Sequence, residues 1–284
     1  MDHHLSSIIH HPTIFERLKM SKFSPLTLFV MIDGLRPDAL AQIDCPTLTG
    51  LRERGSSTLA ATSVMPSVTL PCHMSIFHSV PPTRHGVVTN DFQPMARPLP
   101  GLIDVAKGAE RRCVAVYNWE PLRNLSLPLS LDFAWYHDLS YQEDGDDLTA
   151  DAAIRYLPAI RPDFAFVYFG TVDTAGHRYG WMSDGYLRQA ERVDRQLGRL
   201  LAALPDDTHL IVQADHGGHE RTHGTESPDD MTIPWIAAGP SIRQGYEITA
   251  PVSLLDTAPT LARILGVPAH RDWEGRCVEE IFTG

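Results

Sequence analysis

Three short apolar runs that each lead into an aspartate constrain the fold of this chain more than any other feature of its sequence. The aspartates and the runs before them are Asp33 after 26–32, Asp173 after 163–169, and Asp215, followed by His216, after 210–212. Runs of this kind are typical of strands buried on both faces of a parallel sheet. Ligands bind at the carboxyl ends of such strands, so these polar side chains are candidates for a common site. Taken singly, each is also compatible with a turn, a helix cap or a polar loop.

Segments with helical periodicity alternate with these runs. Helices are predicted at 46–54, 101–110, 146–160, 183–204 and 253–265, and further strands at 57–62, 113–117 and 232–238. The helix at 183–204 has one apolar face and Ser183 as a candidate N-cap. A short amphipathic tail is expected from Trp273 onwards. This alternation predicts an α/β fold with a mostly parallel central sheet and helices on both faces.

The chain shows no internal repeat and no low-complexity linker, which favours a single domain over residues 26–284. Residues 1–25 are expected to form a flexible N-terminal extension in which Met20 is an alternative start. Residues 91–145 are rich in proline, aromatic and acidic residues without a clear period. We predict that they form an excursion over the top of the sheet that shapes a substrate pocket.

The composition restricts which binding partners and which cellular location are expected for the protein. The formal net charge of −11 disfavours a nucleic-acid or anionic-membrane surface, whereas an enzyme for phosphate compounds remains compatible if metal ions neutralise charge locally. The four cysteines form no C-x-x-C pair, so neither a disulfide framework nor a structural zinc site is expected and a cytoplasmic location fits best. The first residues lack the pattern of a signal peptide, and no apolar run of about 18 residues predicts a membrane span.

A hydroxyl completes the set of candidate site residues. Thr69 precedes a helical pattern and is expected at or near its N-cap, where it either caps the helix or, next to a metal ion, serves as a nucleophile. His73 is expected to be buried structure, and the N-terminal histidines are weaker candidates for metal binding, namely His3, His4, His10 and His11. Asp173 and His177 are expected on the loop after 163–169.

Three carboxylates, three imidazoles and a hydroxyl are enough for two metal ions with positions left for substrate oxygens. The residues are Asp33, Thr69, Asp173, His177, Asp215, His216 and His223. Mixed carboxylate and imidazole ligation favours Zn²⁺, with Mn²⁺ as the alternative, over Mg²⁺.

Five ordered segments, VMIDGLRPD, PSVTLPCH with RHGVVTN, GTVDTAGHRYG, ADHGGH and HGTESPDDMTIPWIAAGP, resemble the alkaline phosphatase superfamily. The nucleotide pyrophosphatase/phosphodiesterase family is the most similar branch. The resemblance implies one zinc ion on Asp33, Thr69, Asp215 and His216, and another on Asp173, His177 and His223. It also implies that Thr69 is the nucleophile and that Asn90 holds a phosphate oxygen. His219 is a weaker alternative to His223.

The resemblance implies a two-metal hydrolase of phosphodiester or pyrophosphate bonds, with nucleotides among the candidate substrates, that works through a phospho-threonine intermediate. A phosphonate C–P hydrolase or a phosphomonoesterase with the same metal site is the alternative. A non-catalytic zinc-binding protein is a further alternative, and it would be signalled by a broken ligand set or a missing nucleophile. Sulfatase activity is disfavoured because the C/S-x-P-x-R segment is absent. The expected partner is a small-molecule phosphate ester.

Overall fold

A computed structural model describes residues 25–284 of the chain. The predicted N-terminal extension, apart from Pro25, and its histidines lie outside the described residues. Within 25–284 no helix is long and apolar enough to cross a membrane.

One sheet of eight strands runs through the centre of the protein in the order β4-β3-β5-β1-β6-β7-β2-β8. β7 runs antiparallel to its neighbours β6 and β2, and the other neighbouring pairs are parallel. The strands are β1 (Thr27–Ile32), β2 (Gly55–Thr62), β3 (Cys113–Tyr117), β4 (Phe133–Tyr136), β5 (Phe164–Phe169), β6 (His209–Gln213), β7 (Thr232–Ala238) and β8 (Tyr246–Glu247). The predicted mostly parallel sheet is therefore confirmed.

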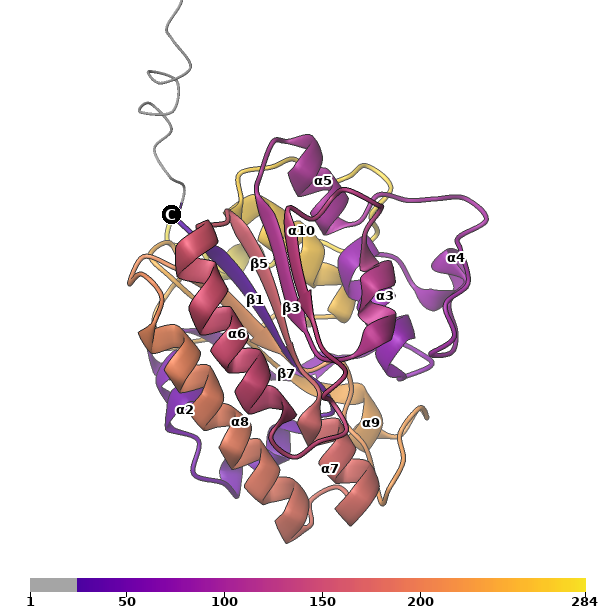
Figure 1. The fold of residues 1–284 in the computed structure, drawn as a ribbon, viewed down its shortest axis with the longest axis vertical. Helices are drawn as coiled ribbons and strands as arrows, with labels where there is room; N and C mark the ends of the chain where they lie inside the picture. The colour runs from indigo at the N-terminus through magenta and orange to yellow at the C-terminus, as the bar shows by residue number, and fades with distance from the viewer. Residues whose placement is uncertain (1–24) are drawn as a thin grey trace, which may run out of the picture.

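Helices cover both faces of this sheet (Figure 1). On one face lie α2 (Pro46–Glu53), α6 (Gly145–Ile160) and α8 (Asp184–Ala202), and on the other lie α3 (Thr69–His78), α5 (Leu102–Gly108) and α10 (Thr257–Ile264). Shorter elements fill the connections: α4 (Pro82–His85), α7 (Thr171–Tyr179), α9 (Pro228–Met231), and the 3₁₀ turns η1 (Pro37–Ala41), η2 (Glu120–Leu125), η3 (Leu254–Asp256) and η4 (Glu279–Ile281). The Ser183 side chain accepts a hydrogen bond from Tyr186 N, which confirms the predicted N-cap of α8.

Aromatic packing fixes α3 against the middle of the sheet. β1 and β5, which pair in parallel, stack Phe29 on Phe166 with ring centroids 5.4 Å apart. Phe77 of α3 meets Phe166 edge to face at 4.9 Å. Every residue of β1 and of α3 is buried, so α3 is packed along its whole length.

One prediction of secondary structure away from the site needs correction, and the tail can now be described. The segment 91–145, in which only a helix and one strand were expected, also contains the edge strand β4, whose residues alternate between half-buried and exposed. The tail after Trp273 is extended apart from η4, because its backbone N–H groups bond to distant partners: Gly275 N donates to Ser79 Oγ and Arg276 N donates to Asp256 Oδ1. These tertiary hydrogen bonds satisfy backbone groups of the tail.

A candidate metal centre with a threonine at its edge

The two central strands β1 and β6 bring Asp33 and Asp215 together. The strands pair in parallel, and each aspartate follows the carboxyl end of its strand. Between them, Gly34 adopts a left-handed conformation (φ 70°) and donates from its N–H to Asp215 Oδ1 at 3.3 Å. A side chain at residue 34 would collide with Asp173, whose Cα would lie 2.9 Å from the added Cβ. Three strand ends therefore meet where only a glycine fits.

Asp173 and His177 lie on helix α7, not on a loop as predicted from the sequence. The helix forms because the buried carboxylate of Asp146 accepts hydrogen bonds from Gly170 N and Thr171 N, each at 3.0 Å, at the start of α7. The spacing of four residues then puts Asp173 and His177 on one face, with His177 Nε2 3.5 Å from Asp173 Oδ2.

Thr69 is the first residue of α3, and Val68 occupies the N-cap position without a capping side chain. The Thr69 hydroxyl does not cap the helix. Its Oγ1 lies 3.3 Å from His216 Nε2, and the side chain is buried. The Asn90 side chain takes the capping role, since its Oδ1 accepts a hydrogen bond from Leu70 N at 2.9 Å. The structure therefore supports the reading in which the Thr69 hydroxyl faces the site.

Two groups of potential metal ligands converge here. Asp33, Asp215 and His216 form the first group: His216 Nε2 lies 3.3 Å from Asp33 Oδ1 and 3.4 Å from Asp215 Oδ2. Asp173, His216 and His223 form the second, with His223 stacked on His216 at a centroid distance of 3.8 Å.

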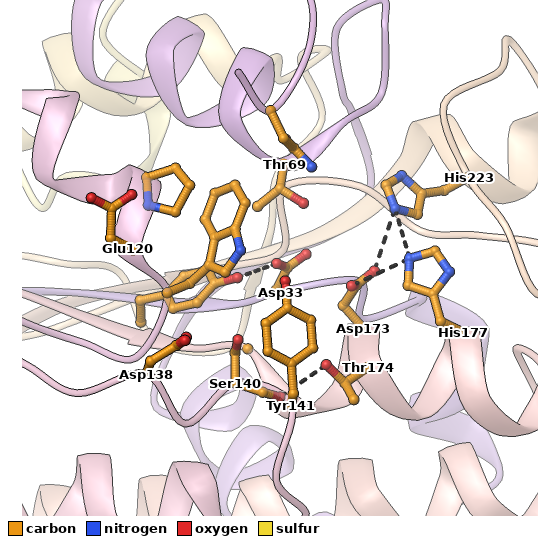
Figure 2. Close-up of a pocket in the computed structure, with 15 residues that line it drawn as sticks. Asp33, Thr69, Glu120, Asp138, Ser140, Tyr141, Asp173, Thr174, His177 and His223 are labelled. Atoms are coloured by element: carbon orange, nitrogen blue, oxygen red, sulfur yellow. Dashed lines mark hydrogen bonds and ion pairs between the residues drawn. The ribbon is translucent and has the colours of Figure 1, made fainter. Parts of the chain in front are cut away.

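His177 adjoins the second group. Its Nε2 lies 3.2 Å from His223 Nε2, and His223 Nε2 lies 3.6 Å from Asp173 Oδ1 (Figure 2). All seven residues expected at the metals thus lie together.

Backbone carbonyl groups fix the orientation of all three imidazoles. Nδ1 of His177, His216 and His223 lies 2.8–2.9 Å from the carbonyl oxygens of Arg221, Gly217 and Ser67, respectively. A carbonyl oxygen only accepts, so each Nδ1 carries the proton of the neutral ring. Each Nε2 therefore turns an electron pair towards the site, as metal-binding histidines do.

Burial makes negative charge on the carboxylates of this cluster unfavourable. Asp33 Oδ1, Asp173 Oδ1 and Asp215 Oδ2 are buried without a hydrogen-bond partner. Burial, followed by repulsion from Asp215 and Asp173, raises the pKa of Asp33 well above its usual value. Burial also lowers the pKa of His216 well below its usual value, which keeps that ring neutral. Divalent cations between these atoms would remove the repulsion and satisfy the unpaired oxygens, so the residues fit a metal centre.

A pocket of about 400 Å³ opens onto this cluster, and we call it the polar pocket. Its wall includes Asp33, Thr69, Asn90, Asp173 and His177. Figure 2 shows Asp173, His177 and His223 on one side, Glu120 and Asp138 on the other, and Asp33 and Thr69 between them. Because the Asn90 carbonyl already bonds to α3, its amide NH₂ group remains available to a ligand oxygen in the pocket.

Sequence reasoning missed three residues that support the cluster. Tyr168 O–H donates a hydrogen bond to Asp33 Oδ2, and Asp146 anchors α7 as described above. Trp181 Nε1 donates to Gly34 O at 3.0 Å, and the indole lies edge-on to His177. The Trp181 side chain is buried and does not line the polar pocket. Nothing in the local pattern around these residues signals their contacts, which join segments far apart in the chain.

Two other histidines have structural partners. His73 is fully buried, with Nδ1 2.8 Å from Thr69 O, in line with the structural role expected for it. His219 Nδ1 lies 2.7 Å from Asp230 Oδ1, and this contact raises the pKa of His219. His223, not His219, therefore joins the cluster.

Sequence comparison relates the chain to enzymes of phosphate esters. The sequence pattern of the type I phosphodiesterase / nucleotide pyrophosphatase family matches residues 27–230. Venom phosphodiesterase 2 of Crotalus adamanteus is 26% identical over 223 residues, which cover 69% of this chain and 27% of the venom protein. Ectonucleotide pyrophosphatase/phosphodiesterase family member 7 of Mus musculus is 22% identical over 217 residues, 67% of this chain and 49% of the mouse protein. The chain thus spans about a quarter of the length of the venom enzyme.

Solved structures share the fold. Murine ectonucleotide pyrophosphatase/phosphodiesterase 5, solved as an inactive threonine-to-alanine variant with AMP, gives a TM-score of 0.78 at 16% identity and covers 92% of this chain and 100% of that one. A phosphonate monoester hydrolase from Silicibacter pomeroyi gives a TM-score of 0.73 at 18% identity, covering 90% of this chain and 76% of that one. At these identities the likeness shows the fold alone.

Proposed function

The chain belongs to the type I phosphodiesterase / nucleotide pyrophosphatase family, and on that premise we propose that it hydrolyses phosphodiester or pyrophosphate bonds of small molecules with two metal ions. One observation carries the proposal: three Nε2 atoms and three unpartnered carboxylate oxygens converge beside the Thr69 hydroxyl. Burying such a set of electron-pair donors costs free energy unless cations bind between them. Nucleotides are candidate substrates because relatives carry nucleotide pyrophosphatase in their names.

We assign one metal ion to Asp33, Thr69, Asp215 and His216 and the other to Asp173, His177 and His223. His216 lies within reach of both groups, since it also lies with Asp173 and His223. The mixture of carboxylate and imidazole ligands favours Zn²⁺, with Mn²⁺ as the alternative. When bound, the two ions would neutralise the buried carboxylates and stabilise negative charge on the oxygens that attack and leave phosphorus.

In the proposed reaction the Thr69 hydroxyl gives up its proton to solvent and Thr69 Oγ1 attacks phosphorus. The new O–P bond forms in line with the ester bond that breaks, and the leaving oxygen takes a proton from solvent. Water then attacks the phospho-threonine, and the Thr69 oxygen leaves and regains its proton. The amide of Asn90 donates to a phosphate oxygen, and the packing of α3 against the sheet holds the nucleophile in position. The α3 N-terminus favours the anion that develops there.

The decisive test compares Thr69→Ala with Thr69→Ser on hydrolysis of bis(p-nitrophenyl) phosphate by zinc-loaded protein. We expect alanine to lower kcat by several orders of magnitude, serine to retain a measurable share, and a quenched reaction to trap phosphate on residue 69. Thr260→Ala is the matched control, because Thr260 is also buried but its hydroxyl bonds to Asp256 O in η3, away from the site. A Thr69→Ala enzyme within tenfold of the native rate would end the covalent mechanism.

A parallel screen of substrate classes would identify the preferred substrate. Nucleotide diesters, pyrophosphates, monoesters and phosphonates would be compared on the same preparation, with and without chelator. A preference for phosphonates or monoesters over both diesters and pyrophosphates would replace the proposed activity with the alternative one at the same metal site.

A further inference from the structure

A second cavity, of about 590 Å³, lies between the C-terminal half of helix α3 and the segment 91–145. We call it the apolar cavity. No residue in the described part of the chain lines both this cavity and the polar pocket, so the two are separate. Its volume is in the range of pockets that enclose a small organic molecule.

One histidine in the wall of the apolar cavity has a ring nitrogen without a partner. His78, the last residue of α3, is 5% exposed, and its Nδ1 lies 2.8 Å from Leu99 O. A carbonyl oxygen only accepts, so Nδ1 carries the ring proton and Nε2 presents an electron pair. Within residues 25–284, nothing donates a hydrogen bond to this buried Nε2.

The His78 ring stays neutral in this position. Burial, the largest influence, outweighs the nearby Asp104 carboxylate and the bond to Leu99 O and lowers the pKa of His78. The neutral Nε2 can only accept, and a buried acceptor without a donor costs free energy comparable to that of a lost hydrogen bond. The cavity therefore favours a ligand that brings a donor to this nitrogen.

The charged groups in the wall of the apolar cavity already have partners within the protein. Asp104 accepts hydrogen bonds from Gly101 N and Leu127 N, each at 2.9 Å. Arg123 pairs with Glu120 at 2.5 Å. A carboxylate ligand has no proton to donate to the imidazole and would lie near Asp104, so the wall favours a neutral ligand.

The rest of the wall suits an aromatic ring. Phe92 and Tyr117 contribute aromatic side chains, and Met74 and Met95 contribute thioethers. Aromatic rings pack favourably against one another, and methionine sulfur makes favourable contacts with ring edges. An aromatic body therefore gains contacts here that a polar one would not.

We propose that the apolar cavity is a second ligand site, which takes a neutral aromatic molecule with one hydroxyl group that donates a hydrogen bond to His78 Nε2. A phenol is the simplest molecule with these features. The ligand is not the phosphate ester of the proposed reaction, and no step of that reaction uses the cavity. Binding of a phenol here is therefore independent of the proposed function.

The test compares the Kd of p-phenylphenol with that of p-methoxybiphenyl, which has the same rings and no proton to donate, by calorimetry on the full chain. We expect the phenol to bind about tenfold more tightly, because only its hydroxyl satisfies the imidazole. p-Phenylbenzoate and n-octanol should both bind more weakly than the phenol, since the first is charged and the second has no ring. A phenol that binds within threefold of its methyl ether, or not at all, would refute the proposal, as would tighter binding of the benzoate or of octanol.

His78→Phe tests the acceptor, because it keeps a ring of similar shape and removes Nε2. We expect this variant to bind the phenol and the methyl ether with equal Kd. His209→Phe is the matched control, since Nε2 of the half-buried His209 already has a partner, Ser241 Oγ at 2.9 Å, outside the cavity. An advantage of the phenol that survives in His78→Phe would mean that another group accepts its proton, and the proposal would be wrong.

Two further measurements keep the proposal testable if His78→Phe does not fold. In native protein with ¹⁵N-labelled histidine, p-phenylphenol should shift the Nε2 resonance of His78 and leave that of His209 in place, and an unmoved His78 resonance at saturation would refute the contact.

Ala134→Phe tests the location, because Ala134 is exposed on the edge strand β4 and lines the apolar cavity. We expect this variant to raise the Kd of the phenol at least tenfold by filling the cavity. Ala60→Phe is the control, since Ala60 is exposed on β2 near the opposite edge of the sheet. Native affinity for the phenol in Ala134→Phe would place the ligand elsewhere and refute the proposal.

Discussion

Replacing Tyr168 by phenylalanine should weaken metal binding, although Tyr168 is not itself a proposed ligand. The phenol O–H donates to Asp33 Oδ2, while Asp33 Oδ1 faces His216 without a hydrogen-bond partner. The two oxygens of the Asp33 carboxylate therefore have different roles: the Tyr168 phenol binds Oδ2, and Oδ1 is available to a cation. Without the phenol, Asp33 can rotate and Oδ2 stays buried without a donor.

The size of the effect follows from this contact. A hydrogen bond to a charged group contributes about 1.5–3 kcal/mol, and loss of a residue that orients a metal ligand typically lowers metal affinity 10–100-fold. We expect Tyr168→Phe to raise the zinc Kd by that factor, measured by competition with a chelator of known affinity. The zinc-loaded variant should also lose about 2 kcal/mol in free energy of unfolding.

Tyr246→Phe is the matched control for this experiment. It removes the same kind of bond, since Tyr246 O–H donates to the Glu280 carboxylate at 2.8 Å, far from the site in the β8 region. This control should leave the zinc Kd unchanged. A Tyr168→Phe protein whose zinc Kd lies within threefold of the native value would show that Asp33 is oriented without the phenol, and our reasoning on this contact would be wrong.

Four further predictions follow from other contacts. Removal of metal with a chelator should abolish hydrolysis of bis(p-nitrophenyl) phosphate and lower Tm, and Zn²⁺ or Mn²⁺ should restore both; full activity with well below one metal ion per chain would contradict the two-metal proposal. Gly34→Ala should lose more stability than Gly86→Ala, because both glycines have positive φ but only at residue 34 would the Cβ meet another backbone, 2.9 Å from Asp173 Cα; equal Tm values would refute the collision. Asp146→Asn should destabilise the protein by about 3 kcal/mol and weaken metal binding through α7, since the carboxylate accepts hydrogen bonds from Gly170, Thr171 and Asn118. An unchanged zinc Kd would show that Asp146 does not position the metal ligands on α7. Burial opposes ionisation of Glu280, but hydrogen bonds from Ala250, Thr249 and Tyr246 outweigh it and lower its pKa to about 2. Ionised Glu280 therefore stabilises the fold above pH 4.5, and this stabilisation is lost as pH falls towards 2. Glu280→Gln should flatten the dependence of unfolding free energy on pH in that window, and an unchanged slope would refute this role of Glu280.

Several sequence predictions stay open. The assignment of 26–284 to a single domain, the role of 91–145 in shaping a substrate pocket and a cytoplasmic location are predictions that await experiment. The metal ions, the nucleophile and the substrate belong to the proposed function.

The sequence by itself determined which aspartates follow the buried strands that carry the site. Apolar runs report burial on both faces, and the residue after each run must then lie at the carboxyl edge of the sheet. Asp33 and Asp215 were therefore predictable from local pattern, as were Thr69 and His223 as candidates, and the five ordered motifs added the family and the role of each residue. The local pattern also gave Ser183 as the cap of α8, since a cap depends on residues within one turn.

Only the tertiary structure decided how these residues are oriented. The proton on each imidazole is set by the carbonyl groups of Ser67, Gly217 and Arg221, and two of these lie far along the chain from the histidines they hold. Helix α7 exists where a loop was predicted because Asp146, some 25 residues earlier, accepts its first N–H groups. Periodicity in a sequence records which side chains are buried, but hydrogen bonds between distant segments depend on how those segments pack, and no local pattern encodes that packing.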